Sequence, residues 1–400
     1  MKLLYLNTLY SPHVGGGAET TLQTLVGGMR DRGHDVVVLA TGPEPGLQEE
    51  VVGGVRVIRA GLRNVYWHHS EKRPAVWRRA LWHSADIYNP AMGTLVEAVV
   101  RRELPDIVSC HNLAGWSVAA WPAIQRAGAP VVQVLHDLYN LCPASTMFRA
   151  GRACPRQCIR CKAFRLPHAR LSRAVDAVVG VSRFVLDRHL EYGRFGRARI
   201  KRTIHNVRAI AAPAWRGPAH AEGEVRFGFI GTLVPAKGIE LLLQTFSRLE
   251  LANAKLIVAG AGKRDYERGL RSRYASERIR FLGYCRPEEF FPTVDVLVVP
   301  SLCCDNLPGV VIESLAYSIP VIGSRRGGIP EMVEEGRNGY LFEPERPDEL
   351  AALLEWLAGD PAAIEAMRPV ARESAVPYLD VGRWVESYES LYREVAACGS

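Results

Sequence analysis

The sequence predicts an α/β protein built from two parallel, doubly wound sheet domains. Short, continuous apolar runs rich in β-branched residues recur along the chain and alternate with stretches of helical spacing. Such runs are typical of strands buried on both faces, as in parallel sheets that are covered by helices. The alternation breaks once near the middle and then restarts, and a length of 400 residues suits two domains better than one.

The first half of the chain is expected to form one Rossmann-like domain over residues 1–205. A stretch with helical spacing, residues 20–30, follows the first apolar run and precedes a turn at residues 31–34. The expected strands of this domain are residues 2–7, 35–40, 55–59, 106–110, 130–136 and 176–181.

Residues 209–218 contain turn formers and no periodicity, so we expect a linker there. A second Rossmann-like domain is then expected over residues 206–380, with strands at residues 225–230, 255–259, 279–282, 294–299 and 320–323. The last segment, residues 381–396, is amphipathic and is expected to pack back on the first domain. Its apolar stripe consists of Trp384, Tyr388, Leu391 and Tyr392.

Charge and hydropathy restrict the class of protein. The net charge is +8, carried by many arginines, and favours anionic partners such as phosphates or an acidic membrane surface over nucleic acid. The chain has no apolar run of membrane-spanning length. Its first residues, MKLLYLNTLYSP, are typical of a buried strand and not of a signal peptide. We therefore expect a cytoplasmic protein, with peripheral contact at the inner membrane face as an open alternative.

The stretch of residues 301–318 stands out because one carboxylate, Glu313, interrupts an apolar helical run that follows a predicted strand. Pro308 suits a first helical position, and Asp305 or Asn306 is expected to cap the free amides. A helix that begins at the carboxyl end of a parallel strand offers a site for an anion. The alternative is a surface cap followed by a tolerated half-buried glutamate.

Further loops suited to phosphates follow other predicted strands. Residues 11–19 contain three consecutive glycines, and residues 231–238 contain Lys237 beside a helix start. Residues 260–263 and 325–331 are similar loops in the second half, and none matches a dinucleotide or Walker fingerprint. Because the carboxyl ends of parallel strands share one edge, these loops and Asp305 predict a site for a phosphorylated, hydroxyl-rich ligand such as a sugar nucleotide. A flexible turn and a solvated lysine are the alternatives.

Two polar pairs, His111-Asn112 and His136-Asp137, follow neighbouring strands of the first half. They are either structural histidines or part of the site, facing the loops of the second domain. An aromatic region at residues 64–69 with Trp77 and Trp82 either lines an acceptor pocket or packs against the first domain.

In these residues the chain resembles the glycosyltransferase family 4 enzymes, which have the GT-B fold. The family's pair of acids with seven residues between them corresponds to Asp305 and Glu313, with Asp in place of the usual Glu at the first position. The phosphate loop keeps Lys237 but has Thr232 where the family has Arg. Either Lys237 and the helix amides near Gly309 take over the role of that arginine, or another arginine such as Arg325 substitutes for it. The resemblance implies that His136, Asp305 and Lys237 are catalytic. It also implies that the donor nucleotide sugar is bound by Gly16, Gly17, Thr232, Lys237, Gly262, Tyr284, Leu307, Gly309, Val310 and Glu313.

The resemblance further implies two Rossmann-like domains facing each other across a cleft, and retaining transfer of a sugar from a nucleotide diphosphate to a hydroxylated acceptor. The acceptor is a glycan, a lipid-linked sugar or a small molecule. No catalytic metal and no organic cofactor are expected. The alternatives are a sugar-nucleotide epimerase or hydrolase of the same fold and, with less support, a basic nucleic-acid-binding protein.

An insert at residues 140–165 contains four cysteines within twenty residues: Cys142, Cys154, Cys158 and Cys161. Four thiolates at such spacing suit a structural zinc ion or an iron–sulfur cluster, and unligated thiols are the alternative. The insert is also rich in arginine, so we expect it to shape the acceptor site or to meet an anionic lipid surface.

Overall fold

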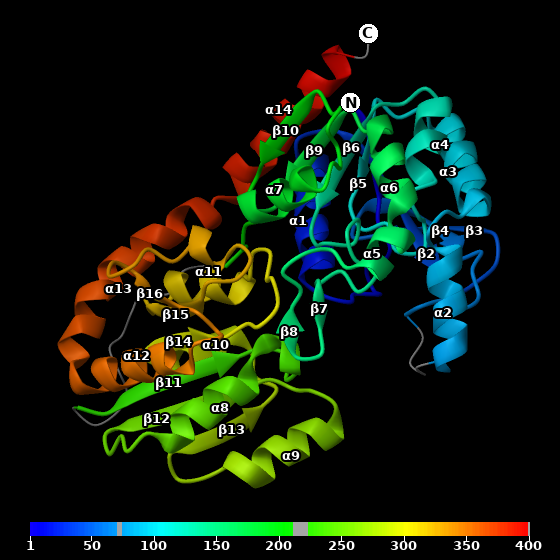
Figure 1. The fold of residues 1–400 in the computed structure, drawn as a ribbon. Coiled ribbons are helices and arrows are strands. Elements are labelled where there is room, and N and C mark those ends of the chain that lie inside the picture. Colours follow the sequence, from blue (N-terminus) through cyan, green and yellow to red (C-terminus); the bar gives the residue numbers. More distant parts are fainter. Residues whose placement is uncertain (70–73, 211–222, 399–400) are drawn as a thin grey trace. The chain divides into compact units, whose positions relative to one another are not determined.

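In the computed structural model, which describes residues 1–69, 74–210 and 223–398, the chain divides into two compact units (Figure 1). The first unit comprises Met1–Met147, Pro155–Asn206 and Val381–Ser400, and the second comprises Phe148–Cys154 and Val207–Asp380. Most of the linker expected at residues 209–218 lies outside the described residues.

The first unit contains an eight-stranded sheet in the order β10-β9-β6-β5-β1-β2-β4-β3. All neighbours are parallel except β3, which pairs antiparallel with β4 at one edge. The order reverses between β1 and β5, and such a switch point leaves a crevice at the carboxyl ends of the strands. The strands are β1 (Lys2–Leu6), β2 (Asp35–Gly42), β3 (Leu47–Val52), β4 (Val55–Gly61), β5 (Ile107–Cys110), β6 (Val131–Leu135), β9 (Ala177–Gly180) and β10 (Ile200–Thr203).

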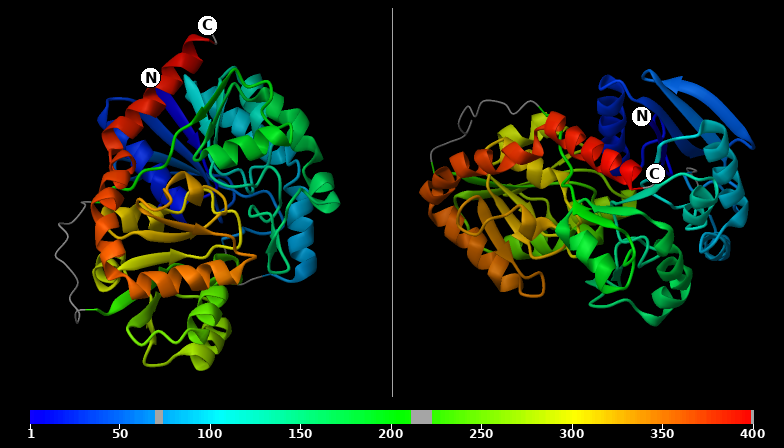
Figure 2. Two further views of the ribbon diagram at one scale, coloured as in Figure 1. Left: turned by 60° about the vertical axis from the view of Figure 1, so that its left-hand side comes forward. Right: turned by 90° about the horizontal axis from the view of Figure 1, so that it is seen from above.

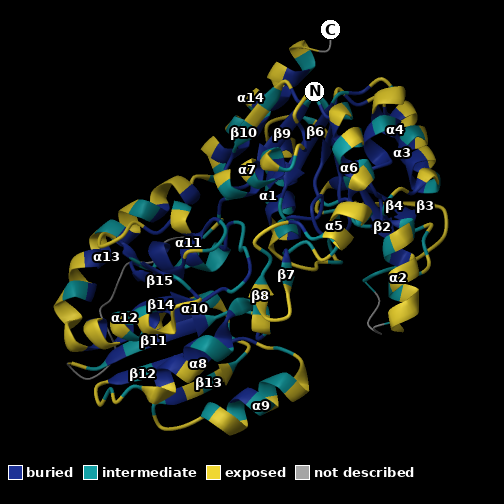
Figure 3. Ribbon diagram, in the orientation of Figure 1, coloured by how far each residue is buried: buried dark blue, intermediate teal, exposed yellow. Residues whose placement is uncertain are grey.

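The helices of this unit are α1 (Gly17–Asp31), α2 (Val76–Ala85), α3 (Pro90–Glu103), α4 (Ala120–Arg126), α5 (Ile159–Phe164), α6 (Leu166–Leu171), α7 (Arg183–Glu191) and α14 (Val381–Ala397). The start of α3 follows standard capping rules, since Asn89 accepts a hydrogen bond from the Met92 amide and Pro90 takes the first turn. These helices and the buried strands enclose the core (Figure 3).

The C-terminal helix α14 returns to the first unit and lies beside α1 (Figure 2). Its apolar stripe is buried, and the Tyr392 hydroxyl donates a hydrogen bond of 2.9 Å to Ser109 Oγ at β5. The helices approach closely because Gly28 leaves space for Val385, which a Cβ atom would overlap. Glu389 adds ion pairs to Arg32 and His34 at the rim of this contact.

The second unit contains a six-stranded parallel sheet in the order β13-β12-β11-β14-β15-β16. The strands are β11 (Val225–Ile230), β12 (Ala254–Ala259), β13 (Ile279–Gly283), β14 (Val296–Val299), β15 (Val321–Ser324) and β16 (Gly339–Phe342). The helices are α8 (Ile239–Arg248), α9 (Arg264–Tyr274), α10 (Pro287–Phe290), α11 (Gly309–Ala316), α12 (Pro347–Gly359) and α13 (Pro361–Ala375). A short hairpin, β7 (Phe148–Arg149) and β8 (Arg152–Ala153), is grouped with this unit.

The α/β class and the parallel, doubly wound sheets agree with the sequence-based prediction. Three edge strands, β3, β10 and β16, were not predicted. Edge strands are half exposed and pair on one side only, so β3 (LQEEVV) and β10 (IKRT) lack the continuous apolar run that marks the central strands. Within the described residues, no helix is both long enough and apolar enough to cross a membrane.

Candidate active site

Lys237 and Asp305 are brought together by two loops that follow the neighbouring strands β11 and β14. The backbone amides of Leu302 and Cys303 in the second loop donate to the carbonyl of Ala236 in the first, at 2.9 and 3.1 Å. Gly238 makes this contact possible, because it has a φ of +69° and a Cβ atom there would overlap the Pro300 carbonyl. The position of Lys237 is thereby fixed by backbone contacts.

The Lys237 ammonium and the Asp305 carboxylate form an ion pair. Asp305 Oδ2 also accepts a hydrogen bond of 3.1 Å from Ser301 Oγ, and the Asp305 carbonyl accepts one of 2.7 Å from the Gly328 amide. Burial by itself would lower the pKa of Lys237, but the adjoining Asp305 carboxylate raises it above its ordinary value. Lys237 is therefore a fixed positive charge at the carboxyl edge of the sheet.

Helix α11 begins immediately after this loop, but its start differs from the expectation. Pro308 is the N-cap residue and not the first helical residue, and no side chain accepts a hydrogen bond from the first amides. The prediction that Asp305 or Asn306 caps the helix is therefore wrong, since the Asp305 carboxylate is directed to Lys237 and Ser301 instead. An eight-residue helix without a side-chain cap retains free amide donors and the positive end of its dipole.

Glu313 lies one turn into α11 and pairs with Arg208, whose Nε atom is 3.2 Å from Glu313 Oε1. Burial raises the pKa of Glu313, while the Arg208 guanidinium opposes that shift. The guanidinium lies across the start of the helix, because a Cβ atom on Gly309 would overlap Arg208 Nη2. A cation beside the positive end of a helix favours an anionic ligand between them.

Arg208 was not predicted as a site residue from the sequence. It lies just beyond β10 and far in sequence from the acidic pair, in a segment that carries no phosphate-binding motif. Its backbone amide donates a hydrogen bond of 2.8 Å to the Tyr378 carbonyl, which anchors the residue within the second unit. By contrast, Arg325, the expected substitute for the missing loop arginine, pairs with Glu335 and Glu343.

The other predicted donor-site residues of the second unit lie on the same edge of the sheet or on α11. Thr232 is exposed in the loop after β11, and Gly262 forms a backbone bridge with Leu233 in that loop. Tyr284 follows β13 with 82% of its surface exposed. Leu307 is buried before α11, and Val310 lies in its first turn, half-buried.

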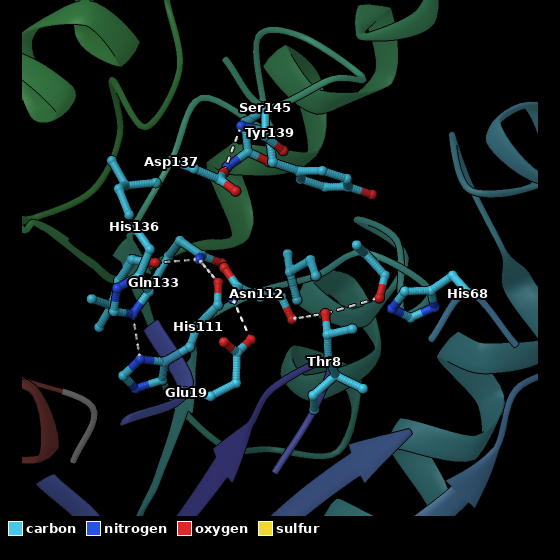
Figure 4. A pocket seen from close by; sticks show the side chains of 16 residues that line it. Thr8, Glu19, His68, His111, Asn112, Gln133, His136, Asp137, Tyr139 and Ser145 are labelled. Carbon is cyan, nitrogen blue, oxygen red and sulfur yellow. Dashed lines mark hydrogen bonds between the residues drawn. The ribbon is translucent and has the colours of Figure 1, made fainter. Parts of the chain in front are cut away.

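In the first unit, His111 and His136 meet in a pocket of about 180 Å³ at the carboxyl ends of β5 and β6 (Figure 4). His111 Nδ1 and His136 Nε2 share a hydrogen bond of 2.8 Å, and His111 Nε2 is 3.2 Å from Ser109 Oγ. Gln133, which was not predicted, donates to the His111 carbonyl and thereby supports this pair. Burial lowers the pKa of His136 to about 4 and that of His111 well below its ordinary value, so both imidazoles are neutral near pH 7.

Two acidic residues, Glu19 and Asp137, line this pocket at different positions (Figure 4). Asn112 Nδ2 donates to Glu19 Oε1 at 3.4 Å, and the Tyr139 amide donates to Asp137 Oδ1 at 2.7 Å (Figure 4). Burial raises the pKa of Asp137, with the Tyr139 amide as the main opposing contact. Gly16 and Gly17 lie beside the pocket at the N-terminus of α1, where Gly16 is the N-cap. The pocket thus presents carboxylates, neutral imidazoles and amides, a set suited to binding hydroxyl groups.

Only part of the aromatic region lies at this pocket. His68 lines it, while Trp82 is buried behind it and donates from Nε1 to the Tyr66 carbonyl. Trp67 donates from Nε1 to Thr41 Oγ1 at 3.2 Å. Trp77 is not a lining residue and has 64% of its surface exposed.

None of the four cysteines of the insert is assigned to a disulfide within the described residues. Cys142 Sγ and Cys161 Sγ are 3.8 Å apart, and the Cys161 amide donates to Cys158 Sγ, whereas Cys154 belongs to the segment grouped with the second unit. Burial, followed by the contacts with Cys158 and Cys142, raises the pKa of Cys161 to about 12. Among the described residues no group of three or more histidine, cysteine or acidic side chains is arranged to hold a metal ion, so the predicted zinc or iron–sulfur site is not supported.

Comparisons with known proteins agree with this geometry. Residues 16–206 match the family described as glycosyl transferase 4-like domain, and residues 224–360 match glycosyl transferases group 1. The chain is 29% identical to an uncharacterized 42.6 kDa protein in the cps region of Klebsiella pneumoniae, covering 86% of this chain and 90% of that protein. It is 27% identical to a glycogen synthase of Mycobacterium tuberculosis, covering 93% and 90% of the two chains.

Solved structures share the fold. A sucrose-phosphate synthase from Thermosynechococcus elongatus superposes with a TM-score of 0.77 at 18% identity, over 99% of both chains. The HepE protein of Anabaena, solved in complex with UDP and glucose, has a TM-score of 0.71 at 19% identity, over 98% of this chain and 100% of the other. The chain therefore belongs to the family 4 type of glycosyltransferases, which have the GT-B fold, and it transfers a sugar from a nucleotide sugar.

Proposed function

We propose that the protein is a retaining hexosyltransferase that uses a UDP-sugar donor and a hydroxylated acceptor. The observation that carries the proposal is the arrangement around α11, where Lys237, Arg208 and an uncapped helix start give three sources of positive potential. Such an arrangement suits a diphosphate. The choice of uracil is supported by the fold relative that was solved with UDP and glucose.

In this proposal each residue of the second unit acts on one part of the donor. Lys237, Arg208 and the amides at Gly309 and Val310 bind the diphosphate. Glu313 accepts hydrogen bonds from the ribose hydroxyls, for which a buried carboxylate is suited. Asp305 binds the donor sugar, and it exchanges part of its contact with Lys237 when the diphosphate arrives.

The pocket of the first unit is proposed to bind the sugar that is transferred and the acceptor. Gly16 and Gly17 allow backbone to approach the diphosphate closely. The neutral His136 contacts the sugar by hydrogen bonding. A pKa of about 4 means that the imidazolium form, which would act as a general acid, is absent near pH 7. His111 holds that imidazole in place.

The proposed chemical step is a same-face substitution at the anomeric carbon. The bond between the anomeric carbon and the diphosphate oxygen breaks, and the electron pair stays with the diphosphate, whose charge Lys237 and Arg208 stabilise. The acceptor oxygen bonds to the same face of that carbon, and its proton passes to the leaving diphosphate oxygen. No step in this scheme is assigned to a metal ion or an organic cofactor.

A thermal-shift panel of UDP, GDP, ADP and their sugars tests the donor, and the anomeric configuration of the product tests retention. We expect UDP to raise the melting temperature of the native protein and to lose most of that effect in Arg208→Gln. Stabilisation by GDP or ADP without UDP would contradict the choice of base. A product of inverted configuration would contradict the retaining mechanism.

The proposed location is the cytoplasm, with peripheral contact at an anionic membrane surface. The net charge of +8 supports this contact. Fractionation of cells into soluble and membrane parts, at low and high salt, tests it.

A further inference from the structure

The stretch between Asp137 and Asp176 contains no acidic residue. It contains eight basic residues, as many as the net charge of the whole chain: Arg149, Arg152, Arg156, Arg160, Lys162, Arg165, Arg170 and Arg173. The last six belong to the first unit, and all of these except Arg165 are exposed. The positive charge of the protein is therefore concentrated on α5, α6 and the residues next to them.

Beside α6 lies a groove of about 730 Å³, formed with the turn that follows α7. Three arginines, Arg170, Arg173 and Arg197, line it together with Leu166, and no acidic side chain does. Within the described part of the chain none of these three guanidinium groups takes part in an ion pair with a carboxylate. The arginines of α3 and α4 differ, since Arg101 and Arg126 both pair with Glu97.

Large apolar side chains are exposed on the same elements. Ile159 on α5 and Leu166 on α6 have 87% and 73% of their surface exposed. Nearby, α2 exposes Val76, Trp77 and Leu81 and buries only Trp82, although a helix that covers a sheet normally buries its apolar face (Figure 3).

Helices α2 and α5 lie in the same part of the first unit (Figure 1), and the electrostatic surroundings of His83 on α2 agree with this. Burial is the main cause that lowers the pKa of His83, and Arg165, Arg79 and Arg160 add to the shift. Because Arg160 lies on α5 and Arg165 directly follows it, the end of α2 that carries Leu81 and His83 lies within electrostatic range of the basic cluster.

Unpaired basic residues next to exposed tryptophan, leucine and isoleucine side chains are typical of surfaces that bind the interface of a bilayer. A soluble polyanion would use the arginines but would leave the apolar side chains in water. We propose that α5, α6 and α2 form a face that docks on an anionic lipid bilayer, with a lipid phosphate held by Arg170, Arg173 and Arg197 in the groove. The inference rests on the membrane contact proposed above and names the residues that make it. It does not depend on which nucleotide sugar is the donor.

The test is co-flotation of the full-length protein with vesicles of phosphatidylcholine, with and without phosphatidylglycerol. We expect binding only to the anionic vesicles. Arg170→Ser/Arg173→Ser should weaken binding at least about tenfold, because each basic residue near an anionic surface contributes roughly a factor of five. The matched control, Arg101→Ser/Arg126→Ser, removes the same charge from α3 and α4 and should weaken it far less. Trp77→Ser/Leu81→Ser should make the remaining binding more sensitive to salt.

Equal flotation of the native protein and Arg170→Ser/Arg173→Ser would overturn the proposal. Binding to heparin without binding to vesicles would also overturn it, and would indicate a soluble polyanion instead. All substituted residues are exposed, and among them only the control pair takes part in ion pairs within the described residues, so melting temperatures should stay unchanged in the other variants. Release of UDP from a soluble donor should also stay unchanged in Arg170→Ser/Arg173→Ser, which separates this result from a failure of the proposed enzymatic function.

Discussion

Replacing Lys237 by methionine removes the charge that we expect to stabilise the leaving diphosphate, while it keeps an unbranched side chain of similar length. In the native structure the ammonium is paired with Asp305, and its pKa is raised, so it is fully charged at neutral pH. Loss of one preorganised group that stabilises charge in the transition state costs about 3 kcal/mol, or roughly a factor of 10² in kcat. We expect a loss of at least that size in Lys237→Met.

The same substitution also affects folding stability, by a smaller amount. The side chains of Lys237 and Asp305 are 35% and 17% exposed, so their ion pair is only partly shielded from water. Breaking it leaves the carboxylate with Ser301 as a remaining partner. The expected change in the free energy of unfolding is about 1 kcal/mol, between the values for exposed and buried pairs.

Lys255→Met is the matched control in the same unit. Lys255 pairs with Glu224 with comparable exposures of 39% and 24%, but it belongs to β12 and not to the loop after β11. The two variants should lose similar stability, measured by chemical denaturation, while only Lys237→Met loses turnover, measured as release of nucleoside diphosphate. If Lys237→Met is folded and its kcat stays within about threefold of native, the assignment of Lys237 to the diphosphate is wrong.

Three further predictions concern the neighbouring residues and the pH dependence. Glu313→Gln should raise the KM for the donor roughly tenfold with little change in kcat in steady-state kinetics, because the ribose contact is equal in ground and transition states. Gly309→Ala should change the free energy of unfolding by less than about 1 kcal/mol in denaturant titration but should raise the KM for the donor, since the new methyl group meets only the flexible end of Arg208 and displaces its guanidinium from the start of α11. His189 has its pKa lowered by burial from 6.5 to about 4, so the unfolded chain binds its proton first as the pH falls. Its contribution, roughly 3 kcal/mol, is complete above pH 6.5 and is lost towards pH 4. His189→Gln should therefore reduce the fall of the melting temperature over that window, and the rest of the fall should remain because His111 and His136 also have lowered pKa values.

The central strands could be predicted from the sequence because a strand that is buried on both faces consists mainly of apolar residues. β11 (VRFGFI) and β12 (AKLIVA) are apolar except for one basic residue each, and their predicted bounds agree with the observed ones to within a residue. The edge strand β3 (LQEEVV) lacks this pattern, because half of its residues are polar or charged and nearly all are exposed. Its position follows from pairing with β4, which is a property of the folded sheet and not of the segment.

The site was predictable where its residues follow strand ends. Lys237 and Asp305 come after adjacent strands, and parallel strands bring such residues to one edge. Arg208 gives no such signal, because it reaches Glu313 from a segment more than a hundred residues earlier, through packing that the sequence does not display. The cap prediction failed for a related reason, since the Asp305 side chain had a stronger partner in Lys237 than in the helix amides.

The position of Arg208 also explains how the phosphate loop can contain threonine at position 232, where the resembled family has arginine. The loop loses one positive charge at Thr232, and Arg208 restores one at the start of α11, where Gly309 leaves the space for it. In the structure its charge is balanced by Glu313, just as that of Lys237 is balanced by Asp305. Each cation of the proposed diphosphate site is therefore held by a carboxylate that is also proposed to bind the donor. Binding the donor would exchange the carboxylate partners of Lys237 and Arg208 for phosphate oxygens and would give Asp305 and Glu313 hydroxyl groups as hydrogen-bond donors in return.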